Sequence, residues 1–106
     1  MSGCCLVTTS LSSEAAAVEL AGTIVSEHLA ACVQVVGPVR SSYRWKDRVE
    51  SATEWLCLAK TTESRRQALF DRIRTLHGYE VPEIIALPIA SGDADYLEWI
   101  RRQTAA

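Results

Sequence analysis

Residues 31–61 read ACVQVVGPVRSSYRWKDRVESATEWLCLAKT, and this stretch decides the fold. Its first half, residues 31–45, begins with mainly apolar residues. After an interruption at Gly37-Pro38 it continues with side chains that partly alternate in type. Lys46-Asp47-Arg48 forms a polar tip, and residues 49–61 return as a second extended arm. A period of two is typical of β-strands, so the stretch predicts a β-hairpin. Each arm has roughly a dozen residues, about twice the length of an ordinary strand.

The far half of this hairpin is rich in aromatic side chains. At about 3.3 Å per residue, such an arm extends about 40 Å, beyond the body of a domain of this size. Tyr43 and Trp45 would lie on an exposed ribbon, with Trp55 near its base. Such a ribbon invites aggregation unless something covers it. We therefore predict that Tyr43, Trp45 and Trp55 lie in the interface of a homo-oligomer. The alternative is a hairpin that bends back onto its own sheet at Gly37-Pro38.

The remaining sequence supplies the other elements of one sheet and its helices. Apolar runs predict two more strands, and helical periodicity with candidate caps predicts two helices. These are residues 4–8 and 84–90 for the strands and residues 14–28 and 64–76 for the helices. A third helix is predicted after Ser91-Gly92-Asp93. The order β-α-β-β-α-β plus a C-terminal helix predicts an α+β fold of the ferredoxin-like split β-α-β type. We expect one domain over residues 1–106.

Three details follow from residue type within the helices. His28 is expected to end the first helix, where its ring can meet the helix dipole. Leu76 shares the apolar spacing of Leu69 and Ile73, so it is expected to point inward. Gly78 is expected to end the second helix in the left-handed conformation.

Composition narrows the classes of partner. The net charge of −2 argues against a general nucleic-acid binder, which is normally basic. No stretch approaches the roughly 20 apolar residues of a membrane-spanning helix. Residues 1–7 lack the features of a signal peptide. The four cysteines contain no C-x-x-C pair and are expected to be reduced. These features predict a cytoplasmic protein without a nucleic-acid or membrane partner.

Residues 77–83, His-Gly-Tyr-Glu-Val-Pro-Glu, gather polar groups on one shaped loop before a strand. Val81 precedes a proline and is therefore biased toward an extended backbone. Loops that deliver polar groups to the edge of a sheet are common binding sites. Two interpretations remain open: His77 ends a helix beside solvated glutamates, or the loop is a ligand site.

A site at a subunit boundary would bring this loop together with a nearby lysine. The residues expected in such a cleft, besides His77, are Lys60, Tyr79, Glu80 and Glu83. Clefts with a few convergent polar groups are common ligand sites. The same groups are equally suited to hydrogen bonds and ion pairs that fasten the subunits together. The chain has no Gly-x-Ser-x-Gly, no phosphate loop and no evident nucleophile–base pair, so we expect no enzyme.

Cys32, His77, Glu80 and Glu83 are the candidate metal ligands. A thiolate with an imidazole favours a copper- or zinc-like ion. No pair of these residues has a diagnostic short spacing, so the spacing itself does not define a site.

Six motifs that span nearly the whole chain resemble those of the CutA1 divalent-cation-tolerance family. They are Leu29-Ala30-Ala31-Cys32-Val33, Ser42-Tyr43-Arg44-Trp45, Lys60-Thr61-Thr62, the stretch from His77 to Ile84, Leu87-Pro88-Ile89, and the stretch from Gly92 to Ile100. The resemblance implies a ferredoxin-like subunit, a homotrimer joined through its long hairpins and sheet edges, and a cytoplasmic role in tolerance of copper and other divalent ions.

The resemblance also implies a metal site, of which two residues carry over. These are Cys32 and His77, whereas the family's first-strand cysteine falls near Thr8 or Thr9, with Cys4-Cys5 earlier on the same strand. The sequence thus predicts a non-enzymatic homotrimer that binds copper or another divalent cation at or near subunit clefts. The alternatives are a PII-like signalling module that binds a small anionic effector at those clefts, and a structural trimeric anchor.

Overall fold

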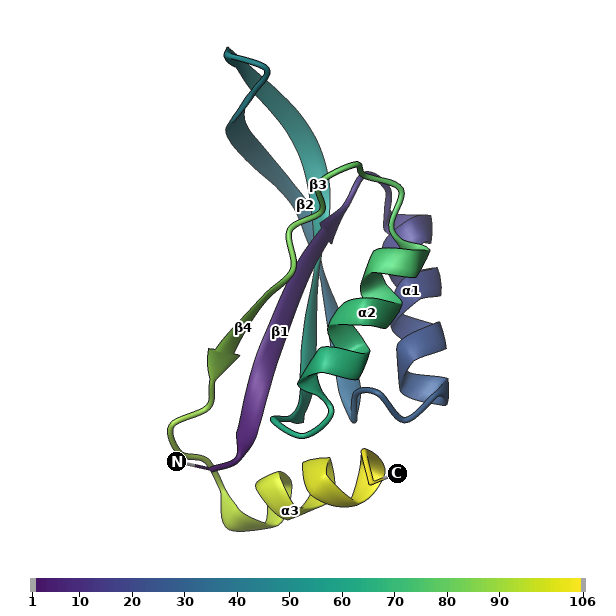
Figure 1. Cartoon of the computed structure of the whole chain (residues 1–106), viewed down its shortest axis with the longest axis vertical. Coiled ribbons are helices and arrows are strands. Elements are labelled where there is room, and N and C mark those ends of the chain that lie inside the picture. Colours follow the sequence, from purple (N-terminus) through teal and green to yellow (C-terminus); the bar gives the residue numbers. More distant parts are fainter. Residues whose placement is uncertain (1, 106) are drawn as a thin grey trace.

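The computed structural model describes residues 2–105 and contains a four-stranded antiparallel sheet in the order β2-β3-β1-β4 (Figure 1). Helices α1 and α2 lie on one side of it, and α3 crosses one end (Figure 1). The elements are β1 (Cys4–Leu11), α1 (Glu14–Ser26), β2 (Cys32–Trp45), β3 (Arg48–Thr62), α2 (Arg66–Leu76), β4 (Ile85–Pro88) and α3 (Ala94–Gln103). This arrangement confirms the predicted α+β, ferredoxin-like class.

The main core lies between the sheet and the two helices on its covered face. In α1, Ala17, Leu20 and Ile24 are buried at helical spacing, and Leu69 and Ile73 do the same in α2. They pack against alternate side chains of the strands, because successive strand residues point to opposite faces. These strand residues are Cys5, Val7, Leu11, Cys57 and Ala59.

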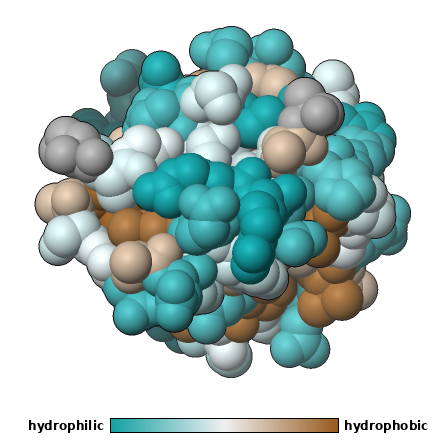
Figure 2. Space-filling model, turned by 90° about the horizontal axis from the view of Figure 1, so that it is seen from below, coloured by the Kyte–Doolittle hydropathy of each residue, from teal (hydrophilic) through white to brown (hydrophobic). Residues whose placement is uncertain are grey.

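The opposite face of the sheet has no helix over it (Figure 1). Register places Leu6, Leu58 and Leu87 on this face, where Leu6 and Leu58 are half-buried and Leu87 is exposed. At the end of the sheet, α3 buries Leu97 and Ile100 in a smaller core. Seen from that end, hydrophilic residues occupy the middle of the surface and hydrophobic ones show mainly toward its rim (Figure 2). Among residues 2–105, no helix is long and apolar enough to cross a membrane.

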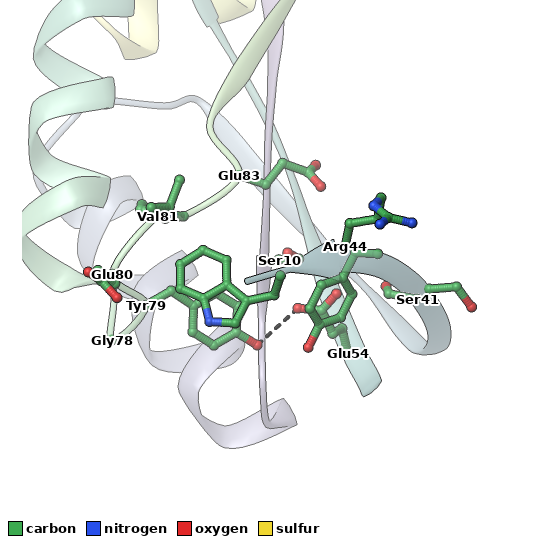
Figure 3. A pocket seen from close by; sticks show the side chains of 13 residues that line it. Ser10, Ser41, Arg44, Glu54, Gly78, Tyr79, Glu80, Val81 and Glu83 are labelled. Carbon is green, nitrogen blue, oxygen red and sulfur yellow. Dashed lines mark hydrogen bonds between the residues drawn. The ribbon is translucent and has the colours of Figure 1, made fainter. Parts of the chain in front are cut away.

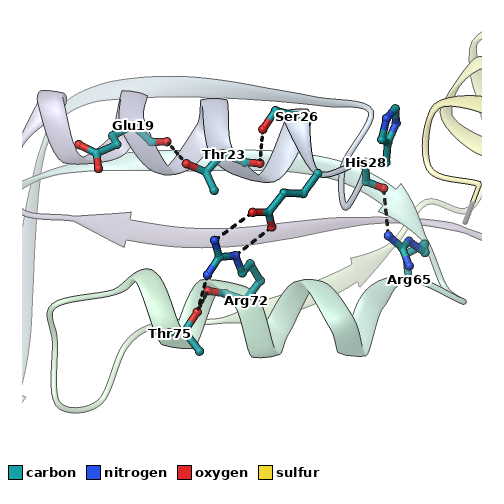
Figure 4. Close-up of polar contacts among 8 residues, drawn as sticks. Glu19, Thr23, Ser26, His28, Arg65, Arg72 and Thr75 are labelled. Carbon is teal, nitrogen blue, oxygen red and sulfur yellow. Dashed lines mark hydrogen bonds and ion pairs between the residues drawn. The ribbon is translucent and has the colours of Figure 1, made fainter.

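Helices α1 and α2 are joined by a two-pronged ion pair (Figure 4). Arg72 donates from Nε to Oε1 of Glu27 and from Nη2 to Oε2, both at 2.9 Å. The hydrogen bonds from Arg72 hold the pKa of Glu27 below its usual range. Both side chains are exposed, so this pair fixes the geometry of the helices more than it stabilises the fold.

The hairpin of β2 and β3 extends well beyond the rest of the chain (Figure 1). Its arms have 14 and 15 residues, and the longest dimension of the molecule is 44 Å against 25 and 22 Å. The turn at its tip contains only Lys46 and Asp47, both with left-handed φ, because Arg48 already pairs with Trp45. The predicted long hairpin is therefore confirmed, and the alternative in which it folds back onto its own sheet is wrong.

The hairpin contains one irregularity, at the predicted interruption. The register between β2 and β3 shifts from Val36 to Val39, so Gly37 and Pro38 form a bulge opposite Trp55. The Gly37–Pro38 peptide bond is cis. A Cβ atom on Gly37 would lie 2.5 Å from Cδ1 of Trp55, so the indole packs directly on the glycine backbone. Trp55 is thus half-buried at the margin of the core rather than exposed on the ribbon.

Several element ends differ from the predicted ones. Strand β1 continues to Leu11 instead of ending at Thr8, because the long β3 offers Leu56 and Trp55 as pairing partners. Strand β4 is only four residues long.

Helix ends differ for local reasons. Helix α1 ends at Ser26, and His28 lies beyond it with φ of 60°. Leu76 is 37% exposed rather than inward, and it is the last residue of α2. Helix α2 ends in an extended His77 with φ of −83° and ψ of 143°, so the left-handed Gly78 prediction is wrong.

Substitution Gly37→Ala should destabilise the fold, because the new methyl group collides with the Trp55 ring. We expect a loss of about 1–3 kcal/mol in the free energy of unfolding, the usual cost of overpacking. Urea denaturation at fixed protein concentration measures it. Gly22→Ala is the control: it has open space in α1 and should gain up to about 1 kcal/mol. An unchanged midpoint for Gly37→Ala would show that the contact does not constrain the hairpin.

Candidate functional site

A cleft of about 890 Å³ opens between the hairpin and the loop that follows α2 (Figure 3). The hairpin contributes residues 41–45 and Glu54, the loop contributes residues 78–83, and β1 contributes Ser10. Register places Ser10 and Glu54 on the face of the sheet that the helices leave open. The cleft therefore combines the projecting part of the hairpin and Glu54 with the loop that the sequence singled out.

Glu54 is the most buried charged group of the cleft. The residue is 7% exposed, and its Oε2 accepts a hydrogen bond of 2.9 Å from the hydroxyl of Tyr79 (Figure 3). Within the described chain, no lysine, arginine or histidine forms an ion pair with it. Burial of a carboxylate without a cationic partner costs stability. Glu54 thus supplies a negative charge that its surroundings do not neutralise.

Tyr79 is held as a proton donor toward this carboxylate. Its partial burial, and then the neighbouring Glu54, raise the pKa of Tyr79 to about 12. The ring also packs on His77, with 4.7 Å between the ring centroids and a tilt of 55°. The phenol is therefore protonated at neutral pH and fixed in place.

His77 anchors the loop to β1. Its Nδ1 accepts the backbone N–H of Tyr79 at 3.2 Å, which leaves Nε2 as the protonated nitrogen that donates to the Ser10 carbonyl at 2.6 Å. That carbonyl lies beyond Thr8, where the pairing of β1 with β4 ends, so the histidine replaces a strand partner. Both ring nitrogens are occupied, and metal binding by His77 would require one of these bonds to break.

The charge of the cleft is negative overall. Among the described residues that line it, Glu54, Glu80 and Glu83 are acidic and Arg44 is basic, which gives −2 at neutral pH. Glu83 is held near β1, where its Oε2 accepts a hydrogen bond of 3.2 Å from the hydroxyl of Thr8. A cleft of this charge attracts cations and repels small anions.

The structure places the other predicted residues in different ways. Lys60 is not among the described residues that line the cleft; its Nζ donates to the side-chain oxygen of Gln34. Tyr43 and Trp45 line the cleft and are 44% and 37% exposed. Trp55 packs on Gly37 instead.

Cys32 lies near the other end of the sheet. Its Sγ is 3.5 Å from the hydroxyl of Tyr96 on α3, and its register partner is Lys60, which pairs in turn with Leu6. His77 contacts Ser10, four residues further along β1, so the two predicted metal ligands are separated by roughly 13 Å along the strands alone. A site that uses both would have to combine them from different subunits.

The donor set for a metal within one chain is sparse. Among residues 2–105, no three His, Cys, Asp or Glu side chains are grouped as metal ligands. All four cysteines are free thiols. Burial raises the pKa of both Cys5 and Cys57 to about 11, so neither is a thiolate at neutral pH. Cys32 is half-buried and is the most accessible thiol.

Substitution Tyr79→Phe tests the Tyr79–Glu54 contact. It leaves the buried carboxylate without its donor, so we expect a loss of about 1–3 kcal/mol in unfolding free energy. The stabilisation should be complete below pH 10 and should decline between pH 10 and about 12, because the folded phenol titrates above its ordinary value of 10.0. Denaturation of Tyr43→Phe, a tyrosine of the same cleft with no hydroxyl partner among residues 2–105, is the control. Equal effects of both substitutions would argue against the contact.

Comparisons with known proteins identify the family of this chain. The family model "CutA1 divalent ion tolerance protein" matches residues 5–103. The Divalent-cation tolerance protein CutA of Thermus thermophilus is 47% identical over 92 residues, which cover 87% of this chain and 89% of that protein. Protein CutA 1, chloroplastic, of rice is 47% identical over 85 residues, and these cover 80% of this chain but only 48% of the rice protein. The solved structure of the Thermus thermophilus protein superposes with a TM-score of 0.93 and 43% identity, covering 96% of this chain and 99% of that one. The chain belongs to the CutA1 divalent ion tolerance protein family.

Proposed function

We propose that this protein is a non-enzymatic, cytoplasmic homotrimer that serves the tolerance of divalent cations and binds them in the cleft beside Glu54. Support for the role comes from the family and from the name of the Thermus thermophilus relative, a divalent-cation tolerance protein. The observation that carries the site is the 7% exposed Glu54 carboxylate, which faces a cleft of net charge −2.

A bound cation would neutralise the buried charge of Glu54. Carboxylate oxygens are the preferred ligands of hard divalent ions, which complete their coordination with water when the protein supplies only one or two ligands. Glu83 also lines the cleft and is a second candidate ligand, with its carboxylate held by the Thr8 hydroxyl on β1. Binding of this kind is weak and tolerant of ion type, which suits a protein that buffers several divalent ions.

Copper binding through Cys32 and His77 is a separate part of the proposal. A thiolate and an imidazole suit copper better than the cleft carboxylates do. Their separation in one chain means that two subunits would have to contribute, one through the Cys32 end of the sheet and one through the loop.

The proposed trimer rests on surface that one chain leaves uncovered. The hairpin exposes Tyr43 and Trp45, and β4 exposes Ile85 and Leu87 on the open face of the sheet. Exposed apolar side chains on this scale suggest contact with another protein. Copies of the same chain can cover this surface, because the hairpin of one copy can contact the exposed sheet edge of another.

The two alternative functions, a PII-like module and a structural anchor, differ in the ligand that they require. A PII-like module that binds an anionic effector in this cleft is disfavoured, because three carboxylates and only one guanidinium are among the described residues that line it. A purely structural anchor requires no ligand at all. It would leave the unneutralised Glu54 without a role.

Titration with Mg²⁺, Mn²⁺, Zn²⁺ and Cu²⁺, followed by calorimetry and thermal shift, tests the site. Glu54→Gln keeps the acceptor for Tyr79 but removes the charge, so we expect at least about tenfold weaker binding, or about 1.4 kcal/mol. Glu50→Gln, an exposed change on the same strand outside the cleft, is the control. Equal affinity of wild type and Glu54→Gln would refute the cleft site.

Copper binding by Cys32 and His77 is tested with a separate pair of variants. Cys32→Ser and His77→Gln should each weaken Cu²⁺ binding. Cys32→Ser, at the other end of the sheet from the cleft, should leave Mg²⁺ binding unchanged. If both variants bind copper as the wild type does, this pair is not the copper site.

A further inference from the structure

The two oxygens of the Glu54 carboxylate have different surroundings. Oε2 accepts the hydrogen bond of 2.9 Å from the Tyr79 hydroxyl, the contact drawn as a dashed line in Figure 3. Oε1 accepts no hydrogen bond from residues 2–105, and it is not among the fully buried side-chain atoms of this range that lack a partner. It therefore remains in contact with the solvent of the cleft, which Glu54 lines. One oxygen is free for a ligand, and the other is engaged.

The Tyr79 hydroxyl is held in this position by the loop after α2. The backbone N–H of Tyr79 donates to Nδ1 of His77, and the two rings pack with 4.7 Å between their centroids. His77 is tied in turn to β1 through the Ser10 carbonyl. Burial of the phenol, and then the neighbouring Glu54, raise the pKa of Tyr79 to about 12, so the hydroxyl remains a donor at neutral pH. The structure thus keeps Oε2 engaged.

Divalent cations differ in how many oxygens of one carboxylate they use. Ca²⁺ takes about six to eight oxygen ligands and often binds both oxygens of a carboxylate. Mg²⁺ requires an octahedron of ligands, keeps several of its waters, and needs only one or two carboxylates from the protein. A cation that uses Oε1 alone leaves the hydrogen bond from Tyr79 intact. A cation that uses both oxygens of Glu54 has to break it.

Only the mode that uses both oxygens bears the cost of that broken bond. A hydrogen bond to a charged acceptor is stronger than an ordinary one, and its loss would leave the partly buried phenol without this acceptor. Glu83 has the same limitation, because its Oε2 already accepts the Thr8 hydroxyl at 3.2 Å. Glu80, the third acid of the cleft, is exposed on the loop and is hydrated there. The hydrogen bonds of the cleft therefore favour coordination through single carboxylate oxygens.

We propose that Tyr79 determines the ion preference of the cleft, because it leaves Glu54 one free oxygen and so favours Mg²⁺ and similar small ions over Ca²⁺. This inference rests on the proposed cation site at Glu54 and adds the selectivity of that site. Tyr79 is a positioning residue, since its hydroxyl contacts the carboxylate and not the cation.

Substitution Tyr79→Phe tests this role, because it keeps the ring beside His77 and removes the hydroxyl. Calorimetry at constant ionic strength measures the affinities for Mg²⁺ and for Ca²⁺ in separate titrations. The ratio of Ca²⁺ to Mg²⁺ affinity should rise about fivefold or more, the scale of one net hydrogen bond. A change in charge or stability that affects both ions equally cancels in this ratio. Tyr43→Phe is the matched control, since Tyr43 lines the same cleft and its hydroxyl has no partner among residues 2–105.

The possible outcomes separate this inference from the site on which it rests. An unchanged ratio in Tyr79→Phe, or an equal rise in Tyr43→Phe, would overturn the role of Tyr79. If Glu54→Gln loses affinity for both ions while Tyr79→Phe keeps the wild-type ratio, the site stands and only the role of Tyr79 fails. If Glu54→Gln binds both ions as the wild type does, the site and this inference fail together.

The wild-type protein offers a second measurement that does not depend on the folding of Tyr79→Phe. Infrared difference spectra between the Mg²⁺-loaded and the free protein show the carboxylate stretching bands that change on binding. Coordination through both oxygens narrows the separation of the antisymmetric and symmetric bands, whereas coordination through one oxygen widens it. We expect the wide separation, in bands that are absent from the spectrum of Glu54→Gln. A narrow separation would overturn the inference.

Discussion

The packing of the Trp55 indole on the backbone of Gly37 is the contact on which the rest of the structure depends. It occurs at the bulge where β2 and β3 leave the core, so it determines where the projecting part of the hairpin begins. Glu54 comes one residue before Trp55 on β3 and therefore points to the opposite face of the sheet. The contact between Trp55 and Gly37 thus positions both the Trp55 indole at the margin of the core and the buried Glu54 carboxylate in the cleft.

The fold could be predicted largely from local pattern, and the candidate site only in part. The long hairpin could be predicted from the alternating side chains and from the Gly37-Pro38 interruption, because both are patterns of residues that are neighbours in the sequence. Lys60 was predicted in a cleft between subunits. Within one chain it contacts Gln34 and is not among the described residues that line the cleft beside Glu54, since the register between strands decides its place. Glu54 was missed because its burial depends on Tyr79, a residue distant in sequence. A carboxylate directly before the apolar run from Trp55 to Ala59 was the available signal.

The near-neutral composition conceals a separation of charge along the molecule. The chain has 13 acidic and 11 basic residues, a balance that by itself indicates no particular ligand. The structure gathers three carboxylates with one arginine in the cleft beside Glu54, whereas Arg65 and Arg101 lie together at the other end, where Arg101 meets Glu98 at 3.5 Å. Both groupings arise from residues far apart in sequence, such as Arg65 with Arg101. Total charge therefore says little about what such a small domain binds.

The proposed trimer requires copies of the same chain to cover the exposed hairpin. Native mass measurement at micromolar concentration, combined with amide hydrogen exchange of the hairpin, can detect this cover. We expect a species of three 11.7 kDa chains, with amides of residues 39–53 protected as strongly as those of β1. A mass of one chain with rapidly exchanging hairpin amides would contradict it.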